Sequence, residues 1–122
     1  MVADVDVLVV GPTPVAPGAV VRCRPIGALL MEDEAGGDEK LLAVPEVKTS
    51  PYYQGVSEGD HLPPIVLDQI GHFFTHYKDL EPKKWVRIGS WGSAEEARSI
   101  IVEAIEAAAL AKLKGQEPSK HL

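Results

Sequence analysis

Hydrophobic residues form short uninterrupted runs in the first half of the chain, a pattern typical of strands. Residues 5–10 include four valines and stop abruptly at Gly11-Pro12, which predicts a buried strand. Residues 19–31 regain strand character, and Pro25 and Gly27 predict a bulge or an edge position within them. We therefore expect two early strands joined by an irregular, proline-rich connection.

A glycine pair marks the next change of direction. Gly36-Gly37 predicts a chain reversal, and residues 40–44 predict the strand that returns from it. Residues 48–62 are rich in Pro, Gly and Ser, which predicts a loop with a short turn around residues 51–53.

Helical spacing replaces the strand pattern after this loop. Pro63 and Pro64 suit a helix start and Pro82 a helix end, with apolar positions at Val66, Ile70, Phe73 and Tyr77. Residues 85–88 predict a short strand. Ser93 and Glu96 then form a capping box ahead of a second helix, whose apolar face comprises Ala97, Ile101, Ala104, Ile105 and Ala108.

Strands followed by two helices predict an α+β fold. Nothing in the sequence divides the chain, so residues 1–114 are expected to form a single domain and residues 115–122 a flexible tail.

Composition and charge narrow the class of protein. The chain has 122 residues, of which 12 are basic and 18 acidic, giving a net charge of −6. A nucleic-acid-binding protein normally has the opposite balance, so nucleic acid is not an expected partner. The sequence contains neither an apolar run long enough to span a membrane nor a secretory signal, and Cys23 is its only cysteine. These features predict a cytoplasmic protein without a membrane partner.

An acidic segment, residues 32–39, is the strongest candidate for a functional site. It contains five acids, and an ordinary reading is a solvated charged turn. In a strand, however, Asp38 and Lys40 would project from the same face, and a hairpin could place Asp33 opposite them. Carboxylates beside an ammonium group suit a hard cation together with the phosphate that it neutralises.

Three further features have competing interpretations. His72 and His76 lie one helical turn apart, with Asp68 a turn earlier; they could bind Zn²⁺, although an exposed polar face or a subunit contact is the more common role. Tyr77-Lys78 could hold phosphate oxygens, but Tyr77 also completes the apolar stripe. Cys23 lies on an apolar strand and is interpreted as a core residue.

The longest motifs are Val20-Val21-Arg22-Cys23-Arg24-Pro25-Ile26-Gly27, Met31-Glu32-Asp33-Glu34-Ala35-Gly36-Gly37-Asp38-Glu39-Lys40-Leu41-Leu42-Ala43-Val44-Pro45, His72-Phe73-Phe74-Thr75-His76-Tyr77-Lys78-Asp79-Leu80-Glu81-Pro82, Lys84-Trp85-Val86 and Trp91-Gly92. Together they closely resemble the soluble inorganic pyrophosphatases of the Mg²⁺-dependent family I type, in uninterrupted order from about Asp6 to Lys114. The resemblance covers the C-terminal two-thirds of such an enzyme.

This resemblance implies a five-stranded OB-like barrel, here incomplete, flanked by two α-helices. It implies hydrolysis of pyrophosphate to two phosphates with Mg²⁺ as cofactor, in a homo-oligomer that is commonly a hexamer, with His72 and His76 near subunit contacts. The implied Mg²⁺ ligands are Asp6, Asp33 and Asp38, and the implied phosphate-binding residues are Lys40, Tyr77 and Lys78.

The resemblance also implies a departure at the N-terminus. Residues 1–4 stand where the family has Asp-Gly-Asp-Pro, so that Ala3 replaces the acid that orients the attacking water. The family's N-terminal portion, with further active-site residues, is missing. We therefore expect impaired hydrolysis, the alternative being a module that binds Mg²⁺ and phosphate or assembles with other subunits.

Overall fold

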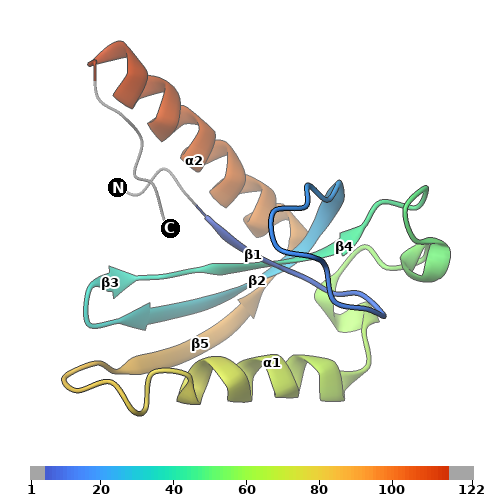
Figure 1. The fold of residues 1–122 in the computed structure, drawn as a ribbon, viewed down its shortest axis with the longest axis horizontal. Helices are drawn as coiled ribbons and strands as arrows, with labels where there is room; N and C mark the ends of the chain where they lie inside the picture. The colour runs from blue at the N-terminus through green and yellow to red at the C-terminus, as the bar shows by residue number, and fades with distance from the viewer. Residues whose placement is uncertain (1–4, 116–122) are drawn as a thin grey trace.

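The computed structural model describes residues 5–115, in which a curled, open sheet lies between two helices (Figure 1). In chain order the elements are β1 (Asp6–Val9), β2 (Cys23–Asp33), β3 (Gly36–Gly37), β4 (Lys40–Pro45), the 3₁₀ turns η1 (Pro51–Tyr53) and η2 (Gly59–His61), α1 (Pro64–His76), β5 (Val86–Gly92) and α2 (Ala94–Leu113). This order confirms the predicted α+β class. None of the helices within the described range has the length and apolar character needed to cross a bilayer.

The long strand β2 is the centre of the sheet. It pairs antiparallel with β4 along residues 23–29, with β5 along residues 28–33, and with the two residues of β3 at its end. β1 pairs in parallel with β4, and its register sets Asp6 opposite Lys40 and Leu8 opposite Leu42. Within residues 5–115, β1 therefore forms one edge of the sheet and β5 the other.

The pairing of β2 with its two neighbouring strands is interrupted by two register shifts. The register with β4 shifts between Pro25 and Gly27, which confirms the predicted bulge, and the register with β5 shifts between Leu29 and Met31. At the second shift the strands approach closely, because a Cβ atom on Gly89 would lie 2.6 Å from the carbonyl oxygen of Leu30. Bulges increase strand twist, so they help the sheet to curl.

The two faces of the sheet bury separate clusters, one under each helix. On one face the buried residues are Ile26, Leu42, Val44 and Leu62, packed against Val66, Leu67 and Ile70 of α1. On the other face they are Ala28, Leu41 and Ala97, packed against Ile100 and Ile101 of α2. Leu41 and Leu42 point to opposite faces because side chains alternate along a strand. Figure 1 shows the two helices on opposite sides of the sheet.

Several local predictions need correction. The first strand is an edge strand rather than a buried one, with Val7 46% exposed, because β4 is its one partner in the described residues. The reversal occurs at Glu34-Ala35, so that Gly36-Gly37 already belong to the returning strand. On the α1 stripe, Phe73 and Tyr77 are largely exposed, whereas Val66 and Ile70 pack on the core. The strand predicted at residues 85–88 extends to Gly92.

The N-terminus of α2 is capped by the side chains of Ser93 and Glu96. Glu96 N–H donates to Ser93 Oγ at 3.1 Å, and Ser93 N–H donates to Glu96 Oε1 at 3.3 Å. This reciprocal pair confirms the predicted capping box. The tail predicted for residues 115–122 lies outside the described residues except for Gly115.

Candidate functional site

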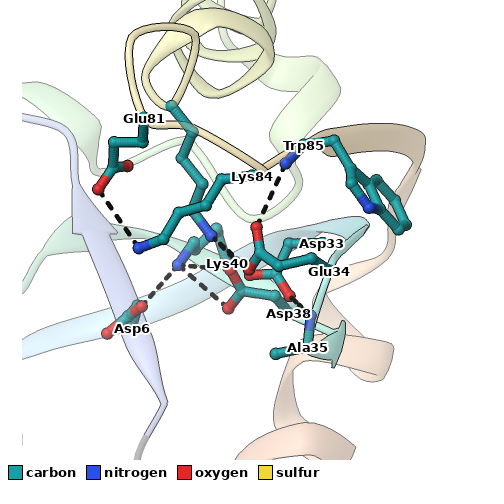
Figure 2. Close-up of polar contacts among 10 residues, drawn as sticks. Asp6, Asp33, Glu34, Ala35, Asp38, Lys40, Glu81, Lys84 and Trp85 are labelled. Carbon is teal, nitrogen blue, oxygen red and sulfur yellow. Dashed lines mark hydrogen bonds and ion pairs between the residues drawn. The ribbon is translucent and has the colours of Figure 1, made fainter.

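Lys40 lies between two carboxylates at the start of β4. Its Nζ donates to Asp6 Oδ2 at 2.6 Å and to Asp38 Oδ1 at 3.1 Å, and Figure 2 shows both contacts. The Lys40 side chain is 10% exposed, so the two carboxylates replace most of the water that would otherwise solvate its charge.

Strand geometry accounts for this arrangement. Asp6 is the register partner of Lys40 across the parallel β1–β4 pair, and Asp38 precedes Lys40 by two residues on the same face. Leu42 follows on that face and belongs to the core beneath α1. The face of β4 therefore changes from apolar to charged within one strand, at the C-terminal end of α1.

A second lysine–carboxylate pair lies where β2 ends. Nζ of Lys78, which follows α1, donates to Asp33 Oδ2 at 2.8 Å and to Glu34 Oε2 at 3.4 Å. The Ala35 N–H donates to the other Asp33 oxygen at 2.9 Å, which fixes the orientation of the carboxylate. Asp33 and Lys78 are both nearly buried, at 10% and 14% side-chain exposure.

The contacts of the site favour the charged forms of Asp33, Lys40 and Lys78. The hydrogen bond from Lys78 lowers the pKa of Asp33 against the opposing effect of burial. The same bond, partly offset by burial, raises the pKa of Lys78. Burial alone would lower the pKa of Lys40, but its bonds to Asp6 and Asp38 outweigh that effect and raise it. Both lysines therefore remain cationic and Asp33 remains anionic near neutral pH.

Aromatic residues at the C-terminal end of α1 contact both lysines. The Tyr77 ring stacks on Phe73 with centroids 5.8 Å apart and meets Phe74 edge-on at 5.5 Å. Lys78 Nζ lies 5.6 Å from the Tyr77 ring centroid, and Lys40 Nζ lies 5.7 Å from that of Phe74. Tyr77 therefore packs beside the site, and its 39% exposure leaves the phenol accessible.

Glu34 and Trp85 are also part of this cluster, although neither was predicted as a site residue. The Trp85 N–H donates to Glu34 Oε1 at 3.2 Å, which joins the loop after α1 to the β2–β3 turn (Figure 2). Glu34 belongs to the acidic segment, which was a usable signal. The position of Trp85 depends on how the chain returns from α1, and no local pattern reports that.

The donor chemistry of the cluster fits a hard divalent cation, since Asp6, Asp33 and Asp38 supply carboxylate oxygens. Among residues 5–115, no three His, Cys, Asp or Glu side chains are placed to hold one ion together. The predicted ligands are instead divided between two lysines, Asp6 and Asp38 on Lys40 and Asp33 on Lys78. Such lysines can bind an incoming polyanion while the carboxylates face a cation that accompanies it.

Comparisons with known proteins identify the family of the chain. The family model for inorganic pyrophosphatase matches residues 3–109. Inorganic pyrophosphatases from Caulobacter vibrioides and Pseudomonas aeruginosa are 56% and 57% identical over 101 and 102 residues, covering 83% and 84% of this chain and 57% and 58% of the relatives. The chain therefore spans less than two-thirds of the length of the curated relatives that it matches.

Solved structures show the same fold. An inorganic phosphatase from Anaplasma phagocytophilum superposes with a TM-score of 0.84 at 48% identity, over 86% of this chain and 61% of that one. The inorganic pyrophosphatase from Helicobacter pylori gives a TM-score of 0.82 at 45% identity, over 84% and 61%. The open sheet is thus the part of a larger fold that the resemblance predicted. From the match to the family model and the identity to these relatives, we conclude that this chain belongs to the inorganic pyrophosphatase family.

Proposed function

We propose that the cluster around Lys40 and Lys78 binds pyrophosphate together with Mg²⁺ and hydrolyses it to two phosphates. One observation carries this proposal: two cationic lysines meet four carboxylates where β1, β2, β4 and the end of α1 converge. The name shared by the curated relatives supports the same reaction.

The two lysines have the chemistry that a diphosphate needs. An ammonium group that already binds carboxylate oxygens can transfer its hydrogen bonds to phosphate oxygens with little change in charge balance. Because the pKa values of Lys40 and Lys78 are raised, both stay protonated while negative charge builds on the departing phosphate. The Tyr77 hydroxyl, beside Lys78, would donate a further hydrogen bond.

The three aspartates would supply oxygens to Mg²⁺ from two positions, Asp6 and Asp38 beside Lys40 and Asp33 beside Lys78. Mg²⁺ prefers carboxylate oxygens and substrate phosphates, and the predicted ligands Asp6, Asp33 and Asp38 supply the former. When bound, Mg²⁺ neutralises phosphate charge and makes an attacking water more acidic. The chain's own contribution is to keep Asp33 anionic through Lys78 and to aim its oxygens through the Ala35 N–H.

Steady-state release of phosphate from pyrophosphate, with and without Mg²⁺, tests the proposal. Ala3 lies outside the described residues and stands where the resemblance expects a water-orienting acid. We therefore expect Mg²⁺-dependent release at a rate about 10²–10⁴-fold below that of the Pseudomonas aeruginosa relative. A rate equal to that of the relative would contradict the impairment, and no Mg²⁺-dependent release would contradict hydrolysis.

The sheet edge favours a second candidate function, assembly with another copy of this chain into a homo-oligomer, which the family resemblance suggests is a hexamer. An apolar groove runs beside β1, lined by side chains that include Val7, Val9, Val15 and Val21. The outer edge of β1 pairs with no strand among residues 5–115, and such an edge favours association. Light scattering at several concentrations tests it. Growth of the particle mass with concentration, suppressed in Val7→Lys, is expected; a monomer at every concentration would contradict it.

A further inference from the structure

The side chain of Glu34 bridges two parts of the chain that form the cluster. Its Oε1 accepts a hydrogen bond from the backbone N–H of Trp85 at 3.2 Å, and its Oε2 accepts one from Lys78 Nζ at 3.4 Å. Glu34 lies in the turn after β2, whereas Lys78 and Trp85 belong to residues 77–85, the segment that connects α1 to β5. One carboxylate therefore contacts this connecting segment near its start and at its end (Figure 2).

The bond to Trp85 extends the pairing of β2 with β5. Backbone pairing between these strands stops where Asp33 lies opposite Val86. Trp85 is the next residue beyond that point, and its N–H donates to the Glu34 side chain. A hydrogen bond to a carboxylate is stronger than one to a neutral carbonyl, and the Glu34 side chain is 28% exposed, so water has limited access to it.

The connecting segment needs such a contact to hold its shape. Residues 77–85 contain neither helix nor strand and consist of successive turns, such as the one closed by the Glu81 N–H on the Lys78 carbonyl. Lys83 has a φ of 65°, a left-handed conformation that side chains other than glycine seldom adopt. Strained backbone persists only where the surrounding structure fixes it, and Glu34 supplies contacts of that kind.

The two anchors of the segment respond differently to a bound polyanion. When Lys78 transfers a hydrogen bond from Asp33 to a phosphate oxygen, as proposed above, its 2.8 Å contact with Asp33 is weakened. The Trp85 N–H is a neutral backbone group, so its bond to Glu34 takes no part in that exchange. Glu34 can therefore keep the segment in place while the Lys78 ammonium group changes partner.

We propose that Glu34 is a positioning residue for the hydrolysis: by binding the Trp85 backbone it fixes the segment that carries Lys78, so that the ammonium group meets the phosphate at a defined place. This inference rests on the proposed hydrolysis of pyrophosphate. Its physical basis is that a displacement of about 1 Å in a group that contacts the reacting atoms can lower a rate by about 10²-fold. Glu34 itself needs no contact with the substrate.

Two replacements of Glu34 separate its acceptor oxygen from its charge. Glu34→Gln keeps an oxygen that can accept the Trp85 N–H, whereas Glu34→Ala removes it. In Glu34→Ala we expect kcat for phosphate release with Mg²⁺ to fall by at least about tenfold while KM changes by less than about threefold. Glu34→Gln should recover kcat to within about threefold of the wild type. Glu46→Ala is the matched control and should keep the wild-type kcat, because Glu46 also pairs with a basic side chain, Arg22, but follows the end of β4 opposite Lys40.

Hydrogen exchange of the Trp85 backbone amide tests the anchor independently of hydrolysis. This amide should exchange at least about tenfold faster in Glu34→Ala than in the wild type and should stay protected in Glu34→Gln. Circular dichroism verifies the fold of each variant. Unchanged exchange in Glu34→Ala, wild-type kcat in Glu34→Ala, or no recovery of kcat in Glu34→Gln would each overturn the positioning role and leave the proposed hydrolysis intact. Absence of Mg²⁺-dependent phosphate release by the wild type would contradict the hydrolysis and, with it, the positioning role.

Discussion

Asp6 and Lys40 are register partners across the parallel strands β1 and β4, and Lys40 Nζ lies 2.6 Å from Asp6 Oδ2. Strand pairing, rather than a loop, therefore sets the distance between a predicted metal ligand and a predicted phosphate ligand. Asp38 completes the environment of Lys40 from the adjoining stretch of chain. The two carboxylates differ in burial, because the Asp6 side chain is 66% exposed and that of Asp38 is 26% exposed.

This difference predicts unequal effects on stability. Asp38→Asn removes a charged partner from the nearly buried Lys40 and should lower the free energy of unfolding by about 2 kcal/mol. Asp6→Asn removes a mostly exposed partner and should lower it by only about 0.5 kcal/mol. Urea unfolding at neutral pH measures both values. A larger loss of unfolding free energy in Asp6→Asn than in Asp38→Asn would contradict the greater weight given to the Asp38–Lys40 contact.

Stability should fall in acid because of Asp33. Its pKa in the folded chain is below the ordinary value of 3.8, since Lys78 stabilises the carboxylate. The unfolded chain therefore takes up the proton first as the pH falls, so the contribution of Asp33 is complete above about pH 4 and is lost as the pH falls through the folded value. Urea unfolding between pH 6 and pH 3 should give a steeper decline for the wild type than for Asp33→Asn. Parallel declines would contradict this assignment.

Two glycine replacements should have opposite effects. A Cβ on Gly89 would meet the Leu30 carbonyl oxygen at 2.6 Å, so Gly89→Ala should destabilise the β2–β5 pair by about 2 kcal/mol. Gly71 lies within α1 with nothing within 4 Å of the added Cβ, so Gly71→Ala should stabilise the chain by about 0.5–1 kcal/mol. Thermal unfolding of both variants measures the changes. A stabilising Gly89→Ala would be inconsistent with the close approach of the strands.

Cation uptake should depend on Asp33. Calorimetric titration with Mg²⁺ in the presence of inorganic phosphate should show binding that Asp33→Asn weakens by at least about tenfold, because an amide cannot supply the anionic oxygen that Mg²⁺ prefers. Asp60→Asn is a matched control, since Asp60 is exposed in η2, away from the cluster. Equal Mg²⁺ uptake by the wild type and Asp33→Asn would contradict a cation-binding role for the acidic segment.

The parts of this site that sequence predicts are those set by local geometry. Alternation along a strand was enough to place Asp38 beside Lys40, and the spacing of Ser93 and Glu96 was enough to predict the cap of α2. The Asp6–Lys40 contact depends on which strands pair, and the sequence does not report that. Lys78 reaches Asp33 only because α1 packs on the core through Val66 and Ile70.

Burial was the least predictable property. Phe73 has the helical spacing of a core residue but is 59% exposed, because periodicity identifies a face of α1 without showing how far the sheet extends beneath it. Val7 was assigned to a buried strand for a similar reason. An apolar run predicts a strand, but the number of its neighbours depends on the rest of the sheet.

The rate of phosphate release from pyrophosphate with Mg²⁺, compared between lysine variants, tests the central claim most directly. Lys40→Met and Lys78→Met keep the unbranched stem of the side chain and remove its charged end, so each should lower the rate by at least about 10²-fold. Lys112→Met, exposed on α2, is the matched control and should release phosphate at the wild-type rate. Equal rates in all four proteins would contradict the assignment of the two lysines to pyrophosphate.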